Sequence, residues 1–500
     1  MKGGEGMDKK EEYEIQATEY QKMQFQKLKK LITADLNDAY ANNSVLLKKY
    51  SKEQIERYLL TPDKNVKELQ DISEFLYITS PHYKRLIDYL SQLSCNYYVL
   101  NSTEYEVDDI KAYKEEYFNV ANRYKRVSFK NINPIIKHEV FLRGIYCGVA
   151  FESKNSFCLK ELNSSYCAIS SVEDGSLFFS FNLDYFNTKA RMTELEQLGN
   201  DFITAYYEYK GDPKRGIPAD KNKKWFEPKN QICVKADCST LQYSLPYFIG
   251  LFTAILDVDI YKEIKKDKAI MDNYKVLAMK MDTNEYGVPT MPFKEAMKYY
   301  NQADSCLPEG VGLIMTPFGM EDFSLQNSAN TDNDLAESAT NQFWNNAGVS
   351  PLLFGIASPS AEIIKLSIKS DELIVFTIDA NIAKAFNTRY KKENNDYEFL
   401  IGFLPVSNYN QSDVVDMLTK LCSYGLPFKS QLMAAAGLEP WQVLSASYLE
   451  DTILKFTKDC LNTPLLQSST MSPDSEAGRP TNAESGKTDS DSTDKDRNHG

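Results

Sequence analysis

Two helical patterns joined by an uncharged apolar loop dominate residues 334–390. The first pattern runs through Trp344 and stops at Gly348, a residue type that suits the position just after a helix end. The second runs from about 361 to 392. The loop between them carries Val349, Leu352, Leu353, Phe354 and Ile356 but no acid, base or histidine. Such a loop is either buried in a core or held between two helices, where it can contact a partner without binding it tightly.

A second long helical pattern covers residues 245–281. A single helix of this length forms a rod of roughly 50 Å, which is unusual within one ordinary domain. The pattern therefore predicts a helix that packs against copies of itself. Its outer face carries Lys262, Lys265, Lys266 and Lys268 among acidic residues. A mixed run of this kind is typical of a solvated face, but copies of the helix around a channel would present these lysines to phosphates as rings.

The remaining patterns predict an α+β fold. Helical spacing marks residues 66–98, and short alternating segments between 138 and 240 favour a mainly antiparallel sheet, with Asp174-Gly175 as a hairpin turn. Residues 282–330 read as a small insertion with one helix and one or two strands. A strand at 396–406 is expected to join the earlier sheet, and residues 411–460 read as short helices.

Composition narrows the class of protein. A chain of 500 residues is expected to form two to four subdomains. A net charge of −13 argues against strong, static, salt-dependent DNA binding. Nine scattered cysteines without a CxxC motif indicate a reducing compartment. We expect no signal peptide, no membrane span, and a disordered acidic tail from about residue 466.

The sequence contains no clear motif for catalysis, metal binding or phosphate binding. His82 and His138 lack metal-ligand spacing, and His499 lies in the tail. Asp257 and Asp259 form a DxD, but residues two apart on a helix point to different faces. Asp332 and Asp334 are expected to cap a helix, and Gly486-Lys487-Thr488 lacks the strand of a phosphate-binding loop. These observations predict no cofactor and no metal.

Two stretches resemble the portal proteins of tailed bacteriophages, specifically long-tailed phages of Gram-positive hosts. One is NQFWNNAGVSPLLFG…SAEIIKLSI…LIVFTIDANIAKAFNTRY, within residues 341–390. The other is LTKLCSYGLPFKSQLMAAAGLEPWQVLSASYLED, followed by AGRP in the tail, within 418–480. The likeness in the order of elements extends over residues 60–480.

The resemblance implies a ring, typically of twelve subunits, in which each subunit has named parts. After an N-terminal segment (1–45), these parts are a wing (46–240), a stem helix (241–281), a clip (282–330) and a second stem helix (331–347). A tunnel loop (348–361), a wing helix and strand (362–408), a crown (409–465) and the acidic tail (466–500) complete the chain.

The resemblance also implies a function without catalysis or cofactor. The ring would be a channel at one capsid vertex for packaging and ejecting double-stranded DNA, which it would contact without sequence specificity. Implied partners are the terminase large subunit, major capsid and scaffold proteins, and a head-completion adaptor. The protein would reside in the virion after assembly in the host cytoplasm, with no membrane partner. The implied channel residues are Val349, Ser350, Pro351, Leu352, Leu353, Phe354, Gly355 and Ile356.

Two alternatives stay open at this point. One is a metal-dependent enzyme of nucleic acid processing that uses Asp257 and Asp259. The other is a cytoplasmic scaffold protein without a DNA role. The enzyme requires Mg²⁺-dependent activity that is lost when either aspartate is replaced, and the scaffold requires that no channel forms.

Overall fold

A computed structural model gives the fold of most of the chain. It describes residues 49–104, 106–153, 156–211, 218–237, 240–272, 275–280, 284, 290–307, 311–316, 323–324, 331–349, 361–393 and 399–455. The chain divides into two compact units, Met1–Pro440 and Trp441–Gly500. None of the helices within the described ranges is long and apolar enough to cross a membrane.

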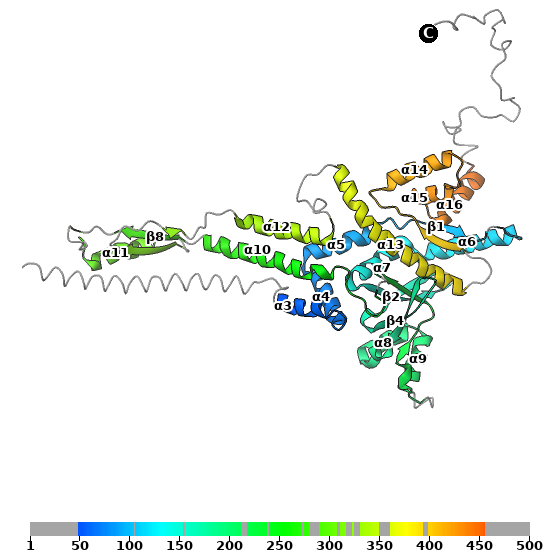
Figure 1. The fold of residues 1–500 in the computed structure, drawn as a ribbon, viewed down its shortest axis with the longest axis horizontal. Helices are drawn as coiled ribbons and strands as arrows, with labels where there is room; N and C mark the ends of the chain where they lie inside the picture. The colour runs from blue at the N-terminus through cyan, green and yellow to red at the C-terminus, as the bar shows by residue number, and fades with distance from the viewer. Residues whose placement is uncertain are drawn as a thin grey trace, which may run out of the picture. The chain divides into compact units, whose positions relative to one another are not determined.

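The described part of the first unit begins with three helices (Figure 1): α3 (Lys52–Leu60), α4 (Val66–Thr79) and α5 (Pro81–Gln92). Ser51 and Gln54 form a reciprocal capping box at the start of α3. Ser80 caps α5 and Pro81 occupies its first turn, where a missing N–H costs nothing. The helices expected within 66–98 are confirmed, with their apolar stripes buried: Leu69, Ile72, Leu76, Leu86, Ile87 and Leu90.

Two further helices follow a short strand, β1 (Tyr98–Ser102), and the sequence patterns did not predict them. They are α6 (Ile110–Val127) and α7 (Phe129–Arg143). Strand structure was expected from about residue 138, but α7 continues to Arg143 and ends at Gly144, with φ +85°. A Cβ atom at Gly144 would lie 1.9 Å from the Leu245 carbonyl oxygen, so only glycine fits where these two segments cross.

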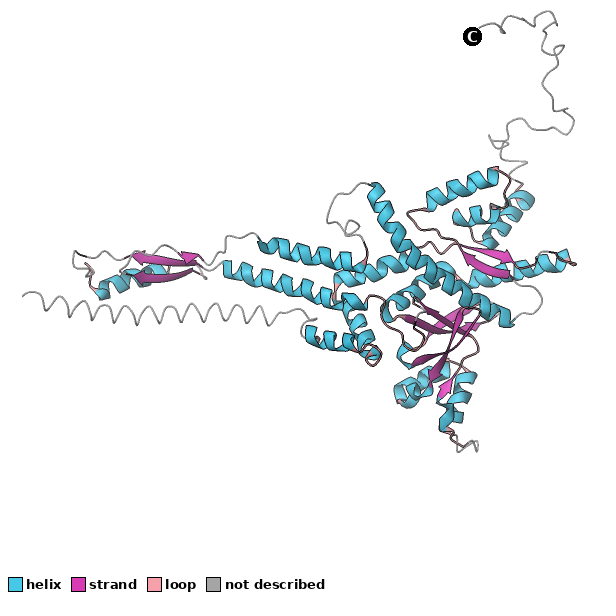
Figure 2. Ribbon diagram, viewed as in Figure 1, coloured by secondary structure: helices cyan, strands magenta, loops and turns pink. Residues whose placement is uncertain are grey.

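Two three-stranded antiparallel sheets form within residues 145–235 (Figure 2), ordered β3-β2-β7 and β4-β5-β6. The predicted hairpin is confirmed, with Asp174 and Gly175 at φ +50° and +74°. The two sheets share one apolar core with α8 and α9. The strands and helices of this region are β2 (Ile145–Glu152), β3 (Phe157–Glu161), β4 (Cys167–Glu173), β5 (Ser176–Asn182), β6 (Trp225–Phe226), β7 (Gln231–Lys235), α8 (Lys189–Gln197) and α9 (Asn200–Lys210).

The expected long helix over 245–281 is wrong at both ends. Helix α10 spans Phe252–Asp272, which at 1.5 Å per residue is about 30 Å. The chain then forms a strand, β8 (Lys275–Lys280), instead of continuing the helix. Partner strands on both sides of β8 satisfy its backbone hydrogen bonds, and that pairing outweighs the local helical pattern.

An insert follows α10 and carries its own small sheet. Strand β8 pairs in parallel with β9 (Val311–Thr316) and antiparallel with β10 (Phe323–Ser324). Between β8 and β9 lies α11 (Phe293–Asp304), whose Ala296 and Tyr300 form a local core against Leu277. The helix and strands expected within 282–330 are therefore confirmed, while the parallel pairing was not foreseen.

Helix α12 (Thr331–Ala347) returns along α10, and the 33-residue α13 (Ala361–Glu393) packs against β5, β7 and β11 (Figure 1). Strand β11 (Phe399–Phe403) was expected to join the earlier sheet. Instead it pairs antiparallel with β1, so that Phe403 lies opposite Tyr98. The two strands form a separate two-stranded sheet, β1-β11.

Short helices end the described chain, as expected for residues 411–460. Helices α14 (Gln411–Ser423) and α15 (Lys429–Ala435) end near Gly425 and Gly437, both at positive φ. They cover a small core of Val406, Leu418 and Ala435. In the second unit, α16 (Pro440–Ser447) continues into a π-helical segment, Tyr448–Ile453.

Candidate functional site

An aromatic anchor holds the end of α12, where the apolar loop begins. We define it as His82, Phe343 and Trp344. Phe343 and Trp344 are buried, and their ring centroids lie 4.9 Å apart. The His82 ring, on α5, packs 6.0 Å from Phe343 and 5.9 Å from Trp344. Burial, together with the charge of Lys262, lowers the pKa of His82, so the ring is neutral at physiological pH and packs as an aromatic group.

The loop leaves α12 through Gly348, which adopts φ +71° as predicted for a residue after a helix end. Val349 follows and is buried, at 4% exposure. The other residues of the predicted channel site lie outside the described residues: Ser350, Pro351, Leu352, Leu353, Phe354, Gly355 and Ile356. Their contact with DNA stays a prediction.

Helix α13, on the other side of the loop, is held by buried acidic side chains. Asp371 accepts a hydrogen bond of 3.1 Å from the Tyr89 hydroxyl group on α5. Glu372 accepts one from the Ser407 hydroxyl group, in the turn before α14. Both acids are less than 10% exposed. Burial raises the pKa of Asp371 to about 6, with the neighbouring Glu372 adding to the effect against the Tyr89 hydrogen bond.

A third buried acid on α13 meets a buried lysine. Lys137 Nζ, on α7, lies 3.0 Å from Asp379 Oδ1, an ion pair whose angles fall short of a hydrogen bond. The ammonium group also donates to Ser94 Oγ at 2.6 Å and Asn96 Oδ1 at 2.8 Å. Burial lowers the pKa of Lys137, while Asp379 works to raise it. This network joins α7, α13 and the segment before β1.

The C-terminal end of α13 is held by an arginine cluster around one carboxylate. Glu152, at the end of β2, lies 3.0 Å from Arg389 Nη2 on α13. Arg123 and Arg126 on α6 contact the same carboxylate at 2.6 and 3.1 Å. Burial works to raise the pKa of Glu152, but the hydrogen bonds and charges of the arginines outweigh it and hold this pKa below its usual range.

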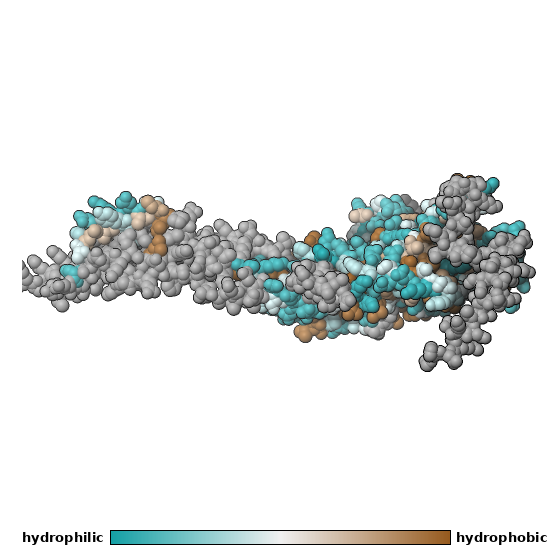
Figure 3. All heavy atoms as spheres, turned by 90° about the horizontal axis from the view of Figure 1, so that it is seen from above, coloured by the Kyte–Doolittle hydropathy of each residue, from teal (hydrophilic) through white to brown (hydrophobic). Residues whose placement is uncertain are grey.

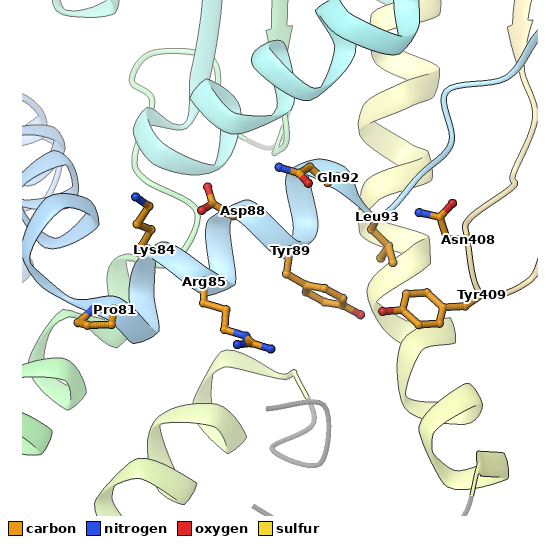
Figure 4. Close-up of a pocket in the computed structure, with 9 residues that line it drawn as sticks. All are labelled: Pro81, Lys84, Arg85, Asp88, Tyr89, Gln92, Leu93, Asn408 and Tyr409. Carbon is orange, nitrogen blue, oxygen red and sulfur yellow. The ribbon is translucent and has the colours of Figure 1, made fainter. Parts of the chain in front are cut away.

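A pocket of about 550 Å³ lies beside these anchors (Figure 4). Its walls come from α5 and from the turn before α14, and the hydroxyl ends of Tyr89 and Tyr409 face one another in it. Asp88 is engaged by the Tyr77 hydroxyl group at 2.8 Å. The lining mixes both signs of charge: Pro81, Lys84, Arg85, Asp88, Tyr89, Gln92, Leu93, Asn408 and Tyr409.

The two aspartates singled out on α10 each pair with a lysine. Asp257 pairs with Lys52 at 2.7 Å, and Asp259 pairs with Lys262 at 3.5 Å. Within the described ranges, no group of three His, Cys, Asp or Glu residues could hold a metal ion. Lys262 and Lys265 are exposed, and Lys266 and Lys268 lie further along α10. His138 packs edge-on to Tyr77, with ring centroids 4.8 Å apart.

A neutral polar face lies on α12 beside the loop. Its exposed residues follow helical spacing: Ser338, Gln342, Asn345 and Asn346. No residue from 338 to 361 carries a charge, although 25% of the whole chain is charged. The uncharged stretch therefore begins well before the loop itself.

Sequence reasoning missed the buried charges of α13. Asp371, Asp379 and Arg389 fall on the same helical stripe as Val375, Ile378 and Ile382, all buried. Charged residues in register with an apolar stripe were the available signal. Because the matching partners lie far away in the sequence, the pattern could not identify them.

Comparisons with known proteins give matches among solved structures alone. No model of a protein family matches the chain, and neither does any curated protein. A chain from the neck of an empty gene transfer agent particle is 11% identical, with a TM-score of 0.44, covering 73% of this chain and 94% of that one.

Two further solved structures are similar. A chain from the neck of the native particle, computed with C12 symmetry, is 11% identical with a TM-score of 0.42, over 75% of this chain and 94% of that one. A phage portal protein of the HK97 family from Corynebacterium diphtheriae is 9% identical with a TM-score of 0.30, over 68% and 95%. All these TM-scores lie below 0.5, so the proposals that follow rest on this chain's own residues.

Proposed function

We propose that this chain is a phage portal protein, the subunit of a ring that conducts double-stranded DNA through one capsid vertex. The observation that carries the proposal is the order of elements around the loop. Helices α10 and α12 pack against each other, and the insert lies between them in the sequence. Helix α12 is then followed by the uncharged segment and by α13. This is the stem, clip, stem, tunnel loop and wing order that the sequence resemblance implies.

The electrostatics around the loop support a sliding contact with DNA. Lysines and arginines bind DNA strongly and in a salt-dependent way, because they neutralise phosphates and release the counterions of the DNA. The segment from 338 to 361 offers no such group, and the chain as a whole carries a net charge of −13. Amide and hydroxyl groups such as those of Gln342, Asn345 and Ser338 can exchange hydrogen bonds with water as a duplex passes.

The anchors on both sides of the loop support its proposed role. The aromatic anchor holds the end of α12, and the three buried acids hold α13. A loop that contacts moving DNA experiences force along the channel. Two firmly held helices transmit that force to the wing instead of letting the loop drift.

The proposed assembly is a homo-oligomeric ring of twelve subunits in the virion. Its proposed partners are the terminase large subunit during packaging, the major capsid and scaffold proteins, and a head-completion adaptor afterwards. The protein itself would perform no bond chemistry, so Asp257→Ala and Asp259→Ala should leave DNA conduction unchanged. On the face that Figure 3 shows, the coloured residues are mainly hydrophilic, with hydrophobic groups between them.

The test is electron microscopy of the purified chain, both alone and produced together with the cognate capsid and scaffold proteins. We expect class averages with rotational symmetry and a central hole wide enough for a duplex. Solid particles or monomers in both preparations would contradict the portal function and favour the scaffold alternative. A Mg²⁺-dependent nuclease activity lost in Asp257→Ala would instead favour the enzyme.

A further inference from the structure

Three cysteines from three different strands meet in the wing core. Cys147 lies on β2, Cys233 on β7 and Cys167 on β4. The Cys147 side chain contacts both of the others. Cys147 and Cys233 are 1% and 3% exposed, and Cys167 packs against the same apolar cluster while remaining half-buried. None of them takes part in the anchors described above.

The strand register brings Cys147 and Cys233 into direct opposition. The Cys147 carbonyl group accepts a hydrogen bond from the Leu162 N–H, on the β3 side, whereas the Ala150 N–H donates to Asn230 on the β7 side. Since backbone groups alternate along a strand, Cys147 and Cys233 form a non-hydrogen-bonded pair. Such pairs have Cα atoms about 4.5 Å apart, within the range of about 4.4–6.8 Å that a disulfide bond requires.

Cys167 connects this pair to solvent. It lines a cavity of about 260 Å³ together with Gln70, Ser165 and Tyr243. Burial, together with contacts to the other two thiols, raises the pKa of Cys147 well above its ordinary value, so Cys147 is a poor first nucleophile. A small disulfide therefore meets Cys167 before it meets either buried partner.

We propose that the three cysteines form a thiol–disulfide site that takes a small-molecule disulfide of the glutathione type and ends as a Cys147–Cys233 cross-strand bond. The Cys167 sulfur attacks one sulfur of glutathione disulfide and releases one glutathione. The Cys147 sulfur then attacks Cys167 and displaces the second glutathione. Finally, the Cys233 sulfur attacks Cys147 and releases Cys167 as a thiol.

The sequence of steps balances. Each attacking thiol gives up its proton, and each leaving sulfur takes one up. Two protein thiols are oxidised in total, and one glutathione disulfide is reduced to two glutathione molecules. The new bond ties β2 to β7 and closes the chain between residues 147 and 233, which restrains the unfolded state. In a reducing cell the pair remains as thiols, and in oxidising surroundings the sheet acquires a covalent tie.

The experiment uses the purified full-length chain incubated with glutathione disulfide, quenched with acid and N-ethylmaleimide, and mapped without reduction by mass spectrometry. Tryptic cleavage separates the three thiols into peptides 144–154, 161–189 and 230–235. We expect the 144–154 peptide to become linked to the 230–235 peptide. We also expect the melting temperature of the oxidised chain to be several degrees above that of the reduced chain.

Variants then test the order of steps. Cys167→Ser should slow formation of the Cys147–Cys233 bond by about tenfold without changing its identity, and Cys233→Ser should stop the reaction at a Cys147–Cys167 bond. Cys158→Ser, at an exposed thiol on neighbouring β3, is the matched control and should change neither. The wild-type map alone overturns the proposal if Cys158 and Cys306 react while all three core cysteines resist until the chain is denatured.

Discussion

The Lys137 ammonium group lies 3.0 Å from the Asp379 carboxylate, and neither side chain is more than 3% exposed. A buried charge without its partner is costly, because the interior cannot solvate it as water does. Lys137 also donates to Ser94 and Asn96, so one side chain joins three segments of the wing.

Lys137→Met should therefore destabilise the fold strongly, by about 3–5 kcal/mol, because Asp379 remains buried and unpaired. Adding Asp379→Asn should recover part of the loss. The measurement is chemical unfolding followed by circular dichroism. Lys130→Met is the matched control on the same helix. The Lys130 side chain is 40% exposed, and its ammonium group lies 3.9 Å from Glu439 and donates to the Gly437 carbonyl group at 3.1 Å, so its effect should stay below about 1 kcal/mol. Equal effects for both lysines would contradict the buried-pair account.

Asp371 should make the fold less stable as pH rises. Its pKa is about 6 in the folded chain, above the ordinary value of 3.8, so the folded state binds this proton more tightly than the unfolded state does. Stability from this group is full below about pH 4 and is lost as pH rises through 6. Asp371→Asn, which still accepts from Tyr89, should raise stability at pH 8 by about 1–3 kcal/mol and change little at pH 4. Melting curves across this range would show a pH-independent difference if the account is wrong.

Glu152 should have the opposite dependence on pH. Its pKa lies below the ordinary value of 4.5, so the stability it contributes is present above that pH and is lost as pH falls through the lowered pKa. Glu152→Gln leaves Arg123, Arg126 and Arg389 facing one another without their shared anion. We expect a loss of about 2–4 kcal/mol at pH 7 that shrinks in acid. A loss that persists at low pH would point to packing instead of charge.

Replacing Leu352, Leu353 and Phe354 together with alanine should impair DNA packaging more than ring formation. The proposal assigns these residues to the channel, so the apolar contact is lost while the anchors of α12 and α13 remain. Packaged DNA per capsid is the measurement, with ring yield by microscopy as its control. Normal packaging would remove the functional support for the tunnel-loop assignment, and loss of rings would assign the residues to assembly.

Local periodicity predicted the helices and strands that bury one face and expose the other. The stripes of α4, α5 and α13 and the alternation in β3 and β4 each have one buried or half-buried face and one exposed face, so spacing alone identified them. It failed at Lys275–Lys280, where a helical pattern continues but strands on both sides decide the outcome. It also missed α6 and α7, and it could not identify β1 as the partner of β11, because about 300 residues separate the two strands in the sequence.

The candidate site was predictable as a region and not as a set of contacts. The loop and its flanking helices follow from charge and spacing within one segment. The partners of α13 do not, because Tyr89, Lys137 and Glu152 lie more than 200 residues before it in the sequence. Only the folded chain brings them together.

The parallel pairing of β8 with β9 has a consequence for how such chains diversify. Parallel neighbours require a crossover, and here α11 provides it while also supplying the apolar side chains that cover the sheet. Within the described residues of the insert, β8, β9 and β10 pair with one another, and α11 supplies the core that packs against Leu277. We therefore expect that natural recombination or protein engineering can exchange or enlarge this insert without redesign of the rest of the subunit.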